Sequence, residues 1–155
     1  MPETLEHAFF GSIDVTAEHV ELRSLPTATG DRIRVGIEMT EQQPSPEELD
    51  ALATACRKHE SWVRRALGRI EERHADRLLA DIERWHPGLL ADEGEREPTA
   101  SELVTLLRPR DLMLWPGTDA PLVLDFGLPL TQPSDHVVSA RFGVDGELAS
   151  VTLES

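Results

Sequence analysis

The strongest constraint in this sequence is residues 45–86, where apolar residues recur at helical spacing along the whole stretch. At 100° per residue, these residues fall within roughly a third of the circumference of a helix. They are Leu49, Leu52, Ala53, Cys56, Val63, Leu67, Ile70, Leu78, Ile82 and Trp85. Charged residues such as Arg65 and Glu72 fall on the opposite side. The spacing therefore predicts a long amphipathic helix that packs one face against the rest of the chain.

Both ends of this helix carry ordinary signals. Ser45 is a good N-cap, Pro46 suits the first helical position, and Glu48 completes a Ser-x-x-Glu capping box. Pro87 and Gly88 follow the last apolar residue, and both residue types end helices. We therefore expect the long helix to occupy residues 45–86.

The length of the stretch raises the question of its shape. A straight helix from Leu49 to Trp85 would span about 55 Å at 1.5 Å per residue. A compact domain of this chain length has a diameter on the order of 40 Å. Because the apolar stripe keeps its phase throughout, we expect one curved helix rather than a helical hairpin. Gly68 is the expected position of the bend.

Strand patterns flank the helix on both sides. Residues 9–15, 19–25 and 33–39 predict a three-stranded antiparallel meander within residues 1–41. Thr99-x-x-Glu102 is a second capping box and opens a short helix. Strands at 111–115, 122–126, 137–144 and 148–153 follow, the last two joined by an Asp145-Gly146 hairpin. We predict a single α+β domain over residues 1–155, with a C-terminal four-stranded antiparallel sheet within 99–155.

Composition narrows the class of protein. Hydrophobic residues make up 39% of the 155, which is enough for a core, and no apolar run approaches the roughly 18 residues of a membrane-spanning helix. The first six residues are acidic and lack the apolar region of a secretory signal. Cys56 is the single cysteine and lies on the apolar stripe, so we expect it to be buried, unreactive and unable to form an intramolecular disulfide. These features favour a cytoplasmic location.

The charge of the chain is strongly acidic. There are 29 acidic and 15 basic residues, a net charge of −14, and residues 92–155 hold 12 of the acidic and 4 of the basic residues. Such a surface repels nucleic-acid phosphates and anionic lipid, so we expect neither as a partner. The acidity either serves solubility alone or forms a surface for a basic protein partner.

Candidate partner-binding residues follow from the second interpretation. The acidic candidates are Asp92, Glu93, Glu95, Glu97, Asp119 and Asp135. Trp62 is a further candidate, because it misses the apolar stripe by roughly 120° at helical spacing. It either packs beneath a neighbouring strand or loop, or is an exposed aromatic anchor for a partner.

The sequence offers little for catalysis or metal binding. Two Glu-x-x-His units, Glu71 with His74 and Glu83 with His86, lie on one predicted helix about 18 Å apart, too far to share a metal pair. There is no nucleophile elbow, no phosphate-binding glycine loop and no cysteine pair. We therefore expect no enzyme activity, no metal and no cofactor. An enzyme that uses Asp125 and His136 is the last-ranked hypothesis.

The layout resembles a family of small bacterial domains of unknown function, several of which occur beside polymorphic toxins and are regarded as their immunity proteins. The likeness lies in the Phe10-Gly11-Ser12-Ile13 strand, the long helix and the Thr99 to Glu102 capping box. It continues in the Leu-Val-Leu-Asp-Phe strand, in Asp135 to Val138 and in Val144 to Leu148. The family's usual Phe-Gly-Gly-His is replaced here by Gln132-Pro133-Ser134-Asp135-His136, so only the histidine matches. The family supplies no catalytic residues.

Two functions are consistent with these observations. The resemblance implies a non-enzymatic immunity protein that neutralises a cognate toxin by occluding its active site, and the acidity suits a basic-surfaced toxin domain. The alternative is a structural or regulatory subunit that associates through the long helix, including a homodimer. The location of exposed apolar area distinguishes them: between acidic loops for the first, on the helix for the second.

Overall fold

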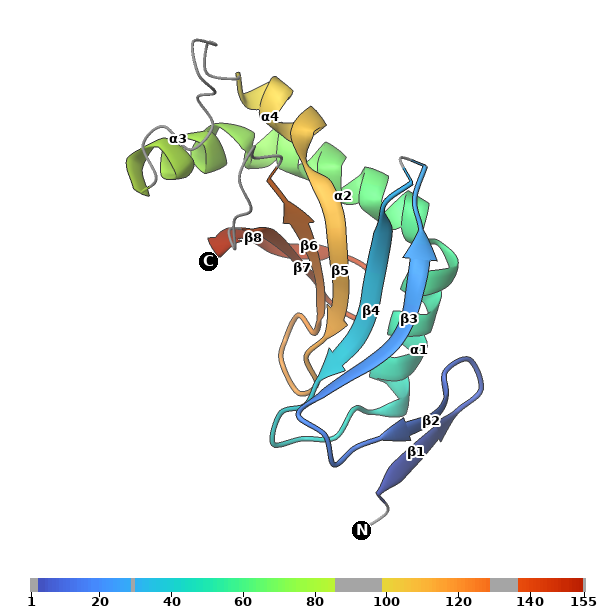
Figure 1. Cartoon of the computed structure of the whole chain (residues 1–155). Coiled ribbons are helices and arrows are strands. Elements are labelled where there is room, and N and C mark those ends of the chain that lie inside the picture. Colours follow the sequence, from blue (N-terminus) through green and yellow to red (C-terminus); the bar gives the residue numbers. More distant parts are fainter. Residues whose placement is uncertain (1–2, 29, 86–98, 129–136, 155) are drawn as a thin grey trace.

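The computed structural model describes residues 3–28, 30–85, 99–128 and 137–154. Within these residues the chain is an α+β protein with helices and two sheets, one of two strands and one of six (Figure 1). The predicted fold class is therefore confirmed at this level. No helix in the described residues is both long and apolar enough to cross a membrane.

The N-terminal region forms a separate hairpin rather than the first strand of a meander. Strand β1 (Thr4–His7) pairs antiparallel with β2 (Gly11–Asp14), and the two make their own sheet. Gly11 has a φ of 74°, which suits a glycine at the turn, and the backbone N–H groups of Phe9 and Phe10 donate to His7 Nδ1. The predicted three-stranded meander is therefore wrong, because this local turn pairs β2 with residues that precede it.

The remaining strands form one continuous six-stranded sheet. They are β3 (His19–Pro26), β4 (Arg32–Glu38), β5 (Arg108–Leu114), β6 (Leu122–Gly127), β7 (Val137–Phe142) and β8 (Leu148–Glu154), in that spatial order. The four C-terminal strands pair antiparallel with their neighbours, as predicted. They do not make a separate sheet, because β5 also pairs with β4 in parallel. A parallel pair needs a long crossover, and the helical residues between β4 and β5 provide it.

The predicted long helix is three helices in the structure. They are α1 (Pro46–Arg57), α2 (His59–Arg73) and α3 (Ala75–Trp85). The breaks lie at Lys58 and His74, whose φ values of −121° and −127° leave the helical range, and not at Gly68. Both predicted capping boxes are present, at the start of α1 and of α4 (Ala100–Leu106).

The break at Lys58 changes which side of the helix faces the sheet. In α1 the buried residues include Leu49, Leu52 and Cys56, which belong to the predicted stripe. In α2 the stripe residue Ile70 is buried as predicted, but Trp62 and Ala66 are buried in place of Val63 and Leu67, which are only half-buried. Trp62 packs on Phe142 of β7 with ring centroids 5.0 Å apart. The small Ala66 allows α2 to lie close to the sheet.

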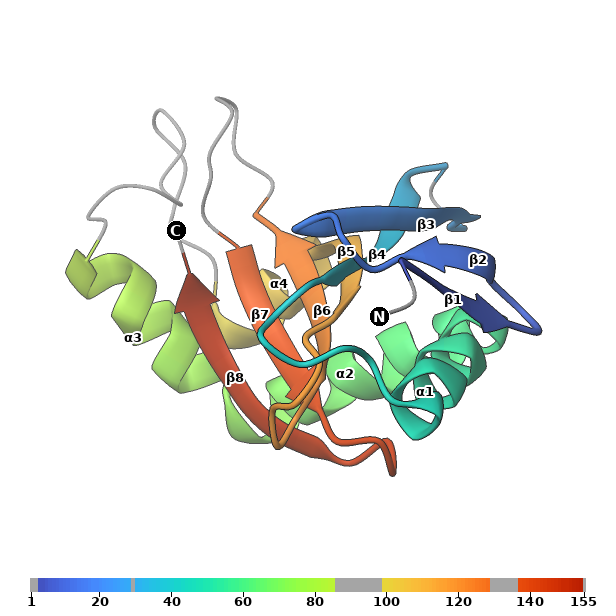
Figure 2. The same ribbon diagram turned by 90° about the horizontal axis from the view of Figure 1, so that it is seen from below.

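The six-stranded sheet has one covered and one uncovered face. Helices α1 and α2 lie behind the sheet in Figure 1, and Figure 2 shows the same arrangement from below. Alternate residues of each strand point into the core beneath the helices, for example Ile33, Val35 and Ile37 of β4. No described helix covers the opposite face, and that face carries the polar members of each alternating strand.

Candidate functional site

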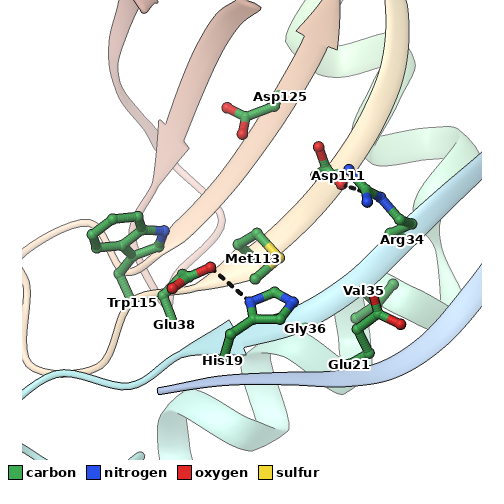
Figure 3. A pocket seen from close by; sticks show the side chains of 10 residues that line it. All are labelled: His19, Glu21, Arg34, Val35, Gly36, Glu38, Asp111, Met113, Trp115 and Asp125. Carbon is green, nitrogen blue, oxygen red and sulfur yellow. Dashed lines mark hydrogen bonds and ion pairs between the residues drawn. The ribbon is translucent and has the colours of Figure 1, made fainter. Parts of the chain in front are cut away.

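A hollow of about 200 Å³ lies on the uncovered face of the sheet, across strands β3 to β6. Its lining comprises His19, Glu21, Arg34, Val35, Gly36, Glu38, Asp111, Met113, Trp115 and Asp125 (Figure 3). These residues come from two parts of the chain that are about seventy residues apart in sequence. The parallel pairing of β4 with β5 brings them together, with Arg34 opposite Asp111 and Gly36 opposite Met113.

Strand alternation explains why polar side chains gather here. On β4 the residues Arg34, Gly36 and Glu38 point away from the helices because their neighbours fill the core. On β5 the same alternation puts Asp111 and Met113 on the uncovered face. The hollow is therefore a direct product of the pleat and the register, and it needs no irregular loop to hold its residues in place.

Four carboxylates and one guanidinium line the hollow. Arg34 Nε donates to Asp111 Oδ1 at 2.9 Å, and His19 Nδ1 lies 2.7 Å from Glu38 Oε1. The Glu21 carboxylate makes no hydrogen bond or ion pair with the residues that the structure describes. The hollow thus carries an excess of negative charge, part of which is uncompensated by the protein itself.

Asp125 is the most deeply placed of these carboxylates. It lies directly opposite Asp111 across β5 and β6, and the Ser139 hydroxyl on β7 donates to its Oδ1. Burial raises the pKa of Asp125 above the usual value, and the negative charge of Asp111 acts in the same direction. The Ser139 hydrogen bond and Arg110 oppose that rise in pKa. A cation placed between Asp111 and Asp125 would relieve both the burial and the repulsion.

An aromatic side chain stands at one end of the hollow. Trp115 follows β5 and is 39% exposed, one of three large hydrophobic side chains in the described residues with exposure of this order. Arg141 Cζ lies 5.7 Å from the centroid of the Trp115 ring, within cation–π range. The ring therefore already offers its face to a guanidinium, and it borders a carboxylate-rich hollow.

Gly36 forms the floor of the hollow. A Cβ at this position would lie 2.5 Å from the Val20 carbonyl oxygen and 3.1 Å from Met113 Cε. The backbone contact cannot relax by rotation of a side chain, so β3 and β4 approach this closely only with glycine here. A side chain at residue 36 would also point into the hollow.

The size and donor set of the hollow limit its ligand. A volume of about 200 Å³ is smaller than the roughly 300–1,000 Å³ of most small-molecule sites. The described residues contain no group of three or more His, Cys, Asp or Glu side chains arranged to hold a metal ion. The arrangement suits one extended cationic side chain, whose charged end meets the carboxylates and whose apolar stem meets Met113 and Trp115.

The structure places only part of the predicted partner-binding set. Asp92, Glu93, Glu95, Glu97 and Asp135 lie outside the described residues, as does His136. Asp119 is exposed in the turn between β5 and β6, which begins beside Trp115. Of the two residues of the enzyme hypothesis, Asp125 lies within the described residues and His136 does not.

Trp62 does not serve as an exposed anchor. Its side chain is 7% exposed and packs on Phe142, beneath the β7–β8 turn. The turn residue Gly146 would place a Cβ 3.6 Å from the Trp62 ring, and Arg65 Nη1 donates to the Gly146 carbonyl at 3.2 Å. The other interpretation of Trp62, that it packs beneath a neighbouring strand or loop, is the one that the structure supports.

Sequence reasoning missed most of the residues of the hollow. Glu21, Arg34 and Glu38 were visible only as the polar members of alternating strands, and Asp111 and Trp115 only as the two ends of a predicted strand. Alternation assigns such residues to a wet face but does not say which strands are neighbours. No local pattern in the sequence predicts the parallel pairing of β4 with β5.

Comparisons with protein-family models, with curated proteins and with solved structures found no match for this chain. The resemblance to immunity-type domains is thus not tested by them and stays a hypothesis. The fold, the charge and the hollow carry the functional argument.

Proposed function

We propose that this protein is a non-enzymatic binding protein that captures a basic protein partner on the uncovered face of its sheet. The observation that carries this proposal is the hollow between β3 and β6, where four carboxylates surround one guanidinium beside the exposed Trp115. An arginine or lysine side chain from the partner enters the hollow. Its charge pairs with Glu21 and with the Asp111–Asp125 pair.

The biological role we propose is that of an immunity protein. A toxin that cleaves nucleic acid, or another enzyme with a basic substrate groove, presents arginine and lysine side chains at its active site. An acidic protein that takes up one of these side chains covers that active site. The net charge of −14 supports this role, because complementary charge speeds encounter and disfavours other acidic surfaces.

The alternative, a subunit that associates through the long helical region, finds less support. The exposed large hydrophobic residues among the described side chains are Leu106, Trp115 and Val144. They lie on α4, at the end of β5 and in the β7–β8 turn, and none lies on α1, α2 or the described part of α3. Trp115 is the one that adjoins a charged hollow.

A pair of short peptides tests the chemistry of the hollow directly. The probe is Ac-Gly-Arg-Gly-amide, and the control is the same peptide with citrulline, which keeps the shape of arginine but not its charge. We expect the arginine peptide to shift the Trp115 indole N–H signal in NMR spectra, and the citrulline peptide to leave it unchanged. Equal shifts with both peptides, or none with either, would contradict the proposed chemistry.

Matched variants locate the effect. Glu21→Gln and Asp125→Asn each remove one carboxylate from the hollow and should weaken arginine-peptide binding about three- to tenfold, the range of one charge-assisted contact. Glu47→Gln, on the exposed first turn of α1, removes the same charge away from the hollow and should have no effect. An equal loss with all three variants would show that only the net charge of the protein matters.

The biological role is tested with a candidate toxin domain, identified by reading the genes next to the one for this chain. Co-expression with this protein should restore survival of cells that produce the toxin, and Glu21→Gln with Asp125→Asn should reduce the protection. Association in solution should slow as salt rises, because the Debye length shrinks from about 10 Å at 0.1 M. A toxin that kills equally with and without the protein would remove the immunity role while leaving the peptide result intact.

A further inference from the structure

A second hollow lies on the other side of the sheet, between helix α2 and the start of β5. Its walls are apolar and come from Ile33, Val63, Leu67, Leu107 and Pro109, and we call it the α2 groove. Its volume is about 350 Å³, within the roughly 300–1,000 Å³ range of small-molecule sites. The groove exists because α2 turns Trp62, Ala66 and Ile70 to the core, which leaves Val63 and Leu67 half-buried beside it.

His59, at the start of α2, lies at one edge of the groove. His59 Nε2 lies 2.7 Å from the Pro26 carbonyl oxygen, which ties the start of α2 to the end of β3. His59 Nδ1 lies 3.2 Å from the Cys56 carbonyl oxygen of the preceding helix.

Positive charge surrounds the groove in an otherwise acidic protein. Arg64 and Arg108 stand at its rim, opposed by the single carboxylate Glu60. Arg108 Nη1 donates to the Thr105 carbonyl at 3.0 Å, which anchors its guanidinium there. A neighbouring hollow shares Arg108 and Pro109 with the groove and is also lined by Arg32, Arg110 and Asp31. The Arg64 side chain makes no hydrogen bond or ion pair with the residues that the structure describes.

We propose that the α2 groove binds an anionic amphiphile, a molecule with an apolar chain and a carboxylate, sulfate or phosphate head. The apolar chain lies against Val63, Leu67 and Pro109, where it buries surface that the protein leaves half-exposed. The anionic head pairs with Arg64, whose guanidinium has no partner among the described residues, and with Arg108. A cationic amphiphile would make the same apolar contacts, but Arg64 and Arg108 would repel its head group.

This inference is independent of the proposed partner site. The α2 groove and the carboxylate hollow share no lining residue, and they carry opposite charge. Ligand binding at one site is therefore expected to leave binding at the other in place. A negative binding result at one site would leave the proposal for the other site unaffected.

The test uses two probes that differ only in the sign of the head group. Decanoate and decyltrimethylammonium are titrated into the full-length protein below their micelle concentrations, and the methyl NMR signals of Val63 and Leu67 report binding in the α2 groove itself. At low salt we expect decanoate to shift these signals with an affinity at least tenfold higher than that of decyltrimethylammonium. Equal affinity for the two probes, or no binding of decanoate, would overturn the proposal.

Charge variants on α2 distinguish specific binding in the groove from non-specific adsorption to the protein. Arg64→Gln should weaken decanoate binding about five- to tenfold, and Glu60→Gln should strengthen it, because one removes the attracting charge and the other the repelling charge. Arg73→Gln, on the same helix but outside the groove, is the matched control and should change nothing. All three side chains are exposed, so the fold is expected to tolerate each change. Affinity unchanged in Arg64→Gln, or equally reduced in Arg73→Gln, would show that Arg64 does not recognise the head group.

Discussion

Asp111 and Asp125 face each other across strands β5 and β6 as direct register partners on the uncovered face of the sheet. Like charges in such a pair repel and cost stability unless a cation separates them. Arg34 partly compensates Asp111, and the Ser139 hydroxyl donates to Asp125. The repulsion between the two carboxylates is therefore only partly offset within the protein, and a bound cationic side chain would reduce it further. Such a locally unfavourable arrangement is typical of a binding surface.

The first prediction concerns the stability cost of Asp125. Asp125→Asn keeps an oxygen that accepts from Ser139 but removes the partly buried charge and its repulsion from Asp111. We expect the variant to be more stable than the parent at neutral pH. Each kcal/mol moves the melting midpoint by about 2–4 °C in a chain of this size, so scanning calorimetry measures the change.

The pH dependence of this difference has a definite sign. Because the pKa of Asp125 is raised in the folded state, the folded protein binds a proton before the unfolded chain does. The cost of Asp125 is therefore full at neutral pH and declines as the pH falls through the raised pKa towards 3.8. The advantage of Asp125→Asn should shrink over that range, and a constant advantage would contradict the burial argument.

The second prediction concerns His74, at the break between α2 and α3. Arg77 donates to His74 Nδ1 at 3.1 Å and to the Val151 carbonyl at 2.6 Å, which links the helices to the edge strand β8. Burial lowers the pKa of His74, and the charges of Arg77 and Arg73 add to that lowering. The unfolded chain therefore binds a proton more readily, and stability declines as the pH falls below 6.5 towards the lowered pKa.

His74→Gln tests this directly, since its amide oxygen still accepts from Arg77 but does not titrate. We expect the loss of stability between about pH 6.5 and 5 to be smaller in the variant, measured by denaturant unfolding at several pH values. Identical pH profiles for His74→Gln and the parent would show that His74 does not contribute.

The third prediction concerns the thiol of Cys56. Its side chain is 3% exposed, and burial raises its pKa to about 12. At pH 8 only about one such thiol in ten thousand is a thiolate, the reactive form. We expect Cys56 to resist Ellman's reagent in the folded protein and to react at once in concentrated guanidinium. Rapid reaction of the folded protein would place Cys56 outside the core.

The fourth prediction concerns Glu48, which joins the start of α1 to the sheet. Glu48 Oε1 accepts from the Ser45 backbone N–H at 2.9 Å, and Oε2 accepts from the Gly117 N–H at 2.9 Å. Glu48→Ala should lower the free energy of unfolding by about 1–2 kcal/mol, because both donors lose their acceptor. Glu102→Ala removes the corresponding acceptor from the capping box of α4 and provides the comparison in the same denaturant titration.

The fifth prediction separates the core face of α2 from its groove face. Ile70 is fully buried, so Ile70→Ala should cost about 2–5 kcal/mol in unfolding free energy. Leu67 is half-buried in the wall of the α2 groove, and Leu67→Ala should cost about 1 kcal/mol or less. Similar costs for the two changes would indicate that Leu67 and Ile70 are equally buried, as the continuous apolar stripe in the sequence predicts.

Local sequence signals determined a large part of this fold. Ser45 with Glu48 and Thr99 with Glu102 place two helix starts correctly, because a capping box satisfies backbone donors within its own four residues. Asp145-Gly146 also places the β7–β8 hairpin correctly, because the turn needs a residue with positive φ, and Gly146 adopts a φ of 84°. Strict alternation likewise places β3 and β4, and the lone cysteine on an apolar stripe is buried as expected.

Tertiary contacts decided what periodicity could not. The spacing of Val63 and Leu67 continues the stripe of α1, yet the structure buries Trp62 and Ala66 instead. The breaks at Lys58 and His74 reorient each helical segment, and Trp62 finds a large partner in Phe142. Periodicity records which residues share one face of an ideal helix, whereas the choice of the buried face also depends on what the sheet offers to it.

The candidate sites show the same division. The sequence by itself determined the excess of acidic residues and, through strand alternation, assigned Glu21 and Glu38 to wet strand faces. Only the tertiary structure decided that Asp111 lies beside them, because β4 and β5 pair in parallel although nearly seventy residues separate them in sequence. Pairing between strands so distant in sequence depends on how the whole core packs, and no short-range pattern encodes it.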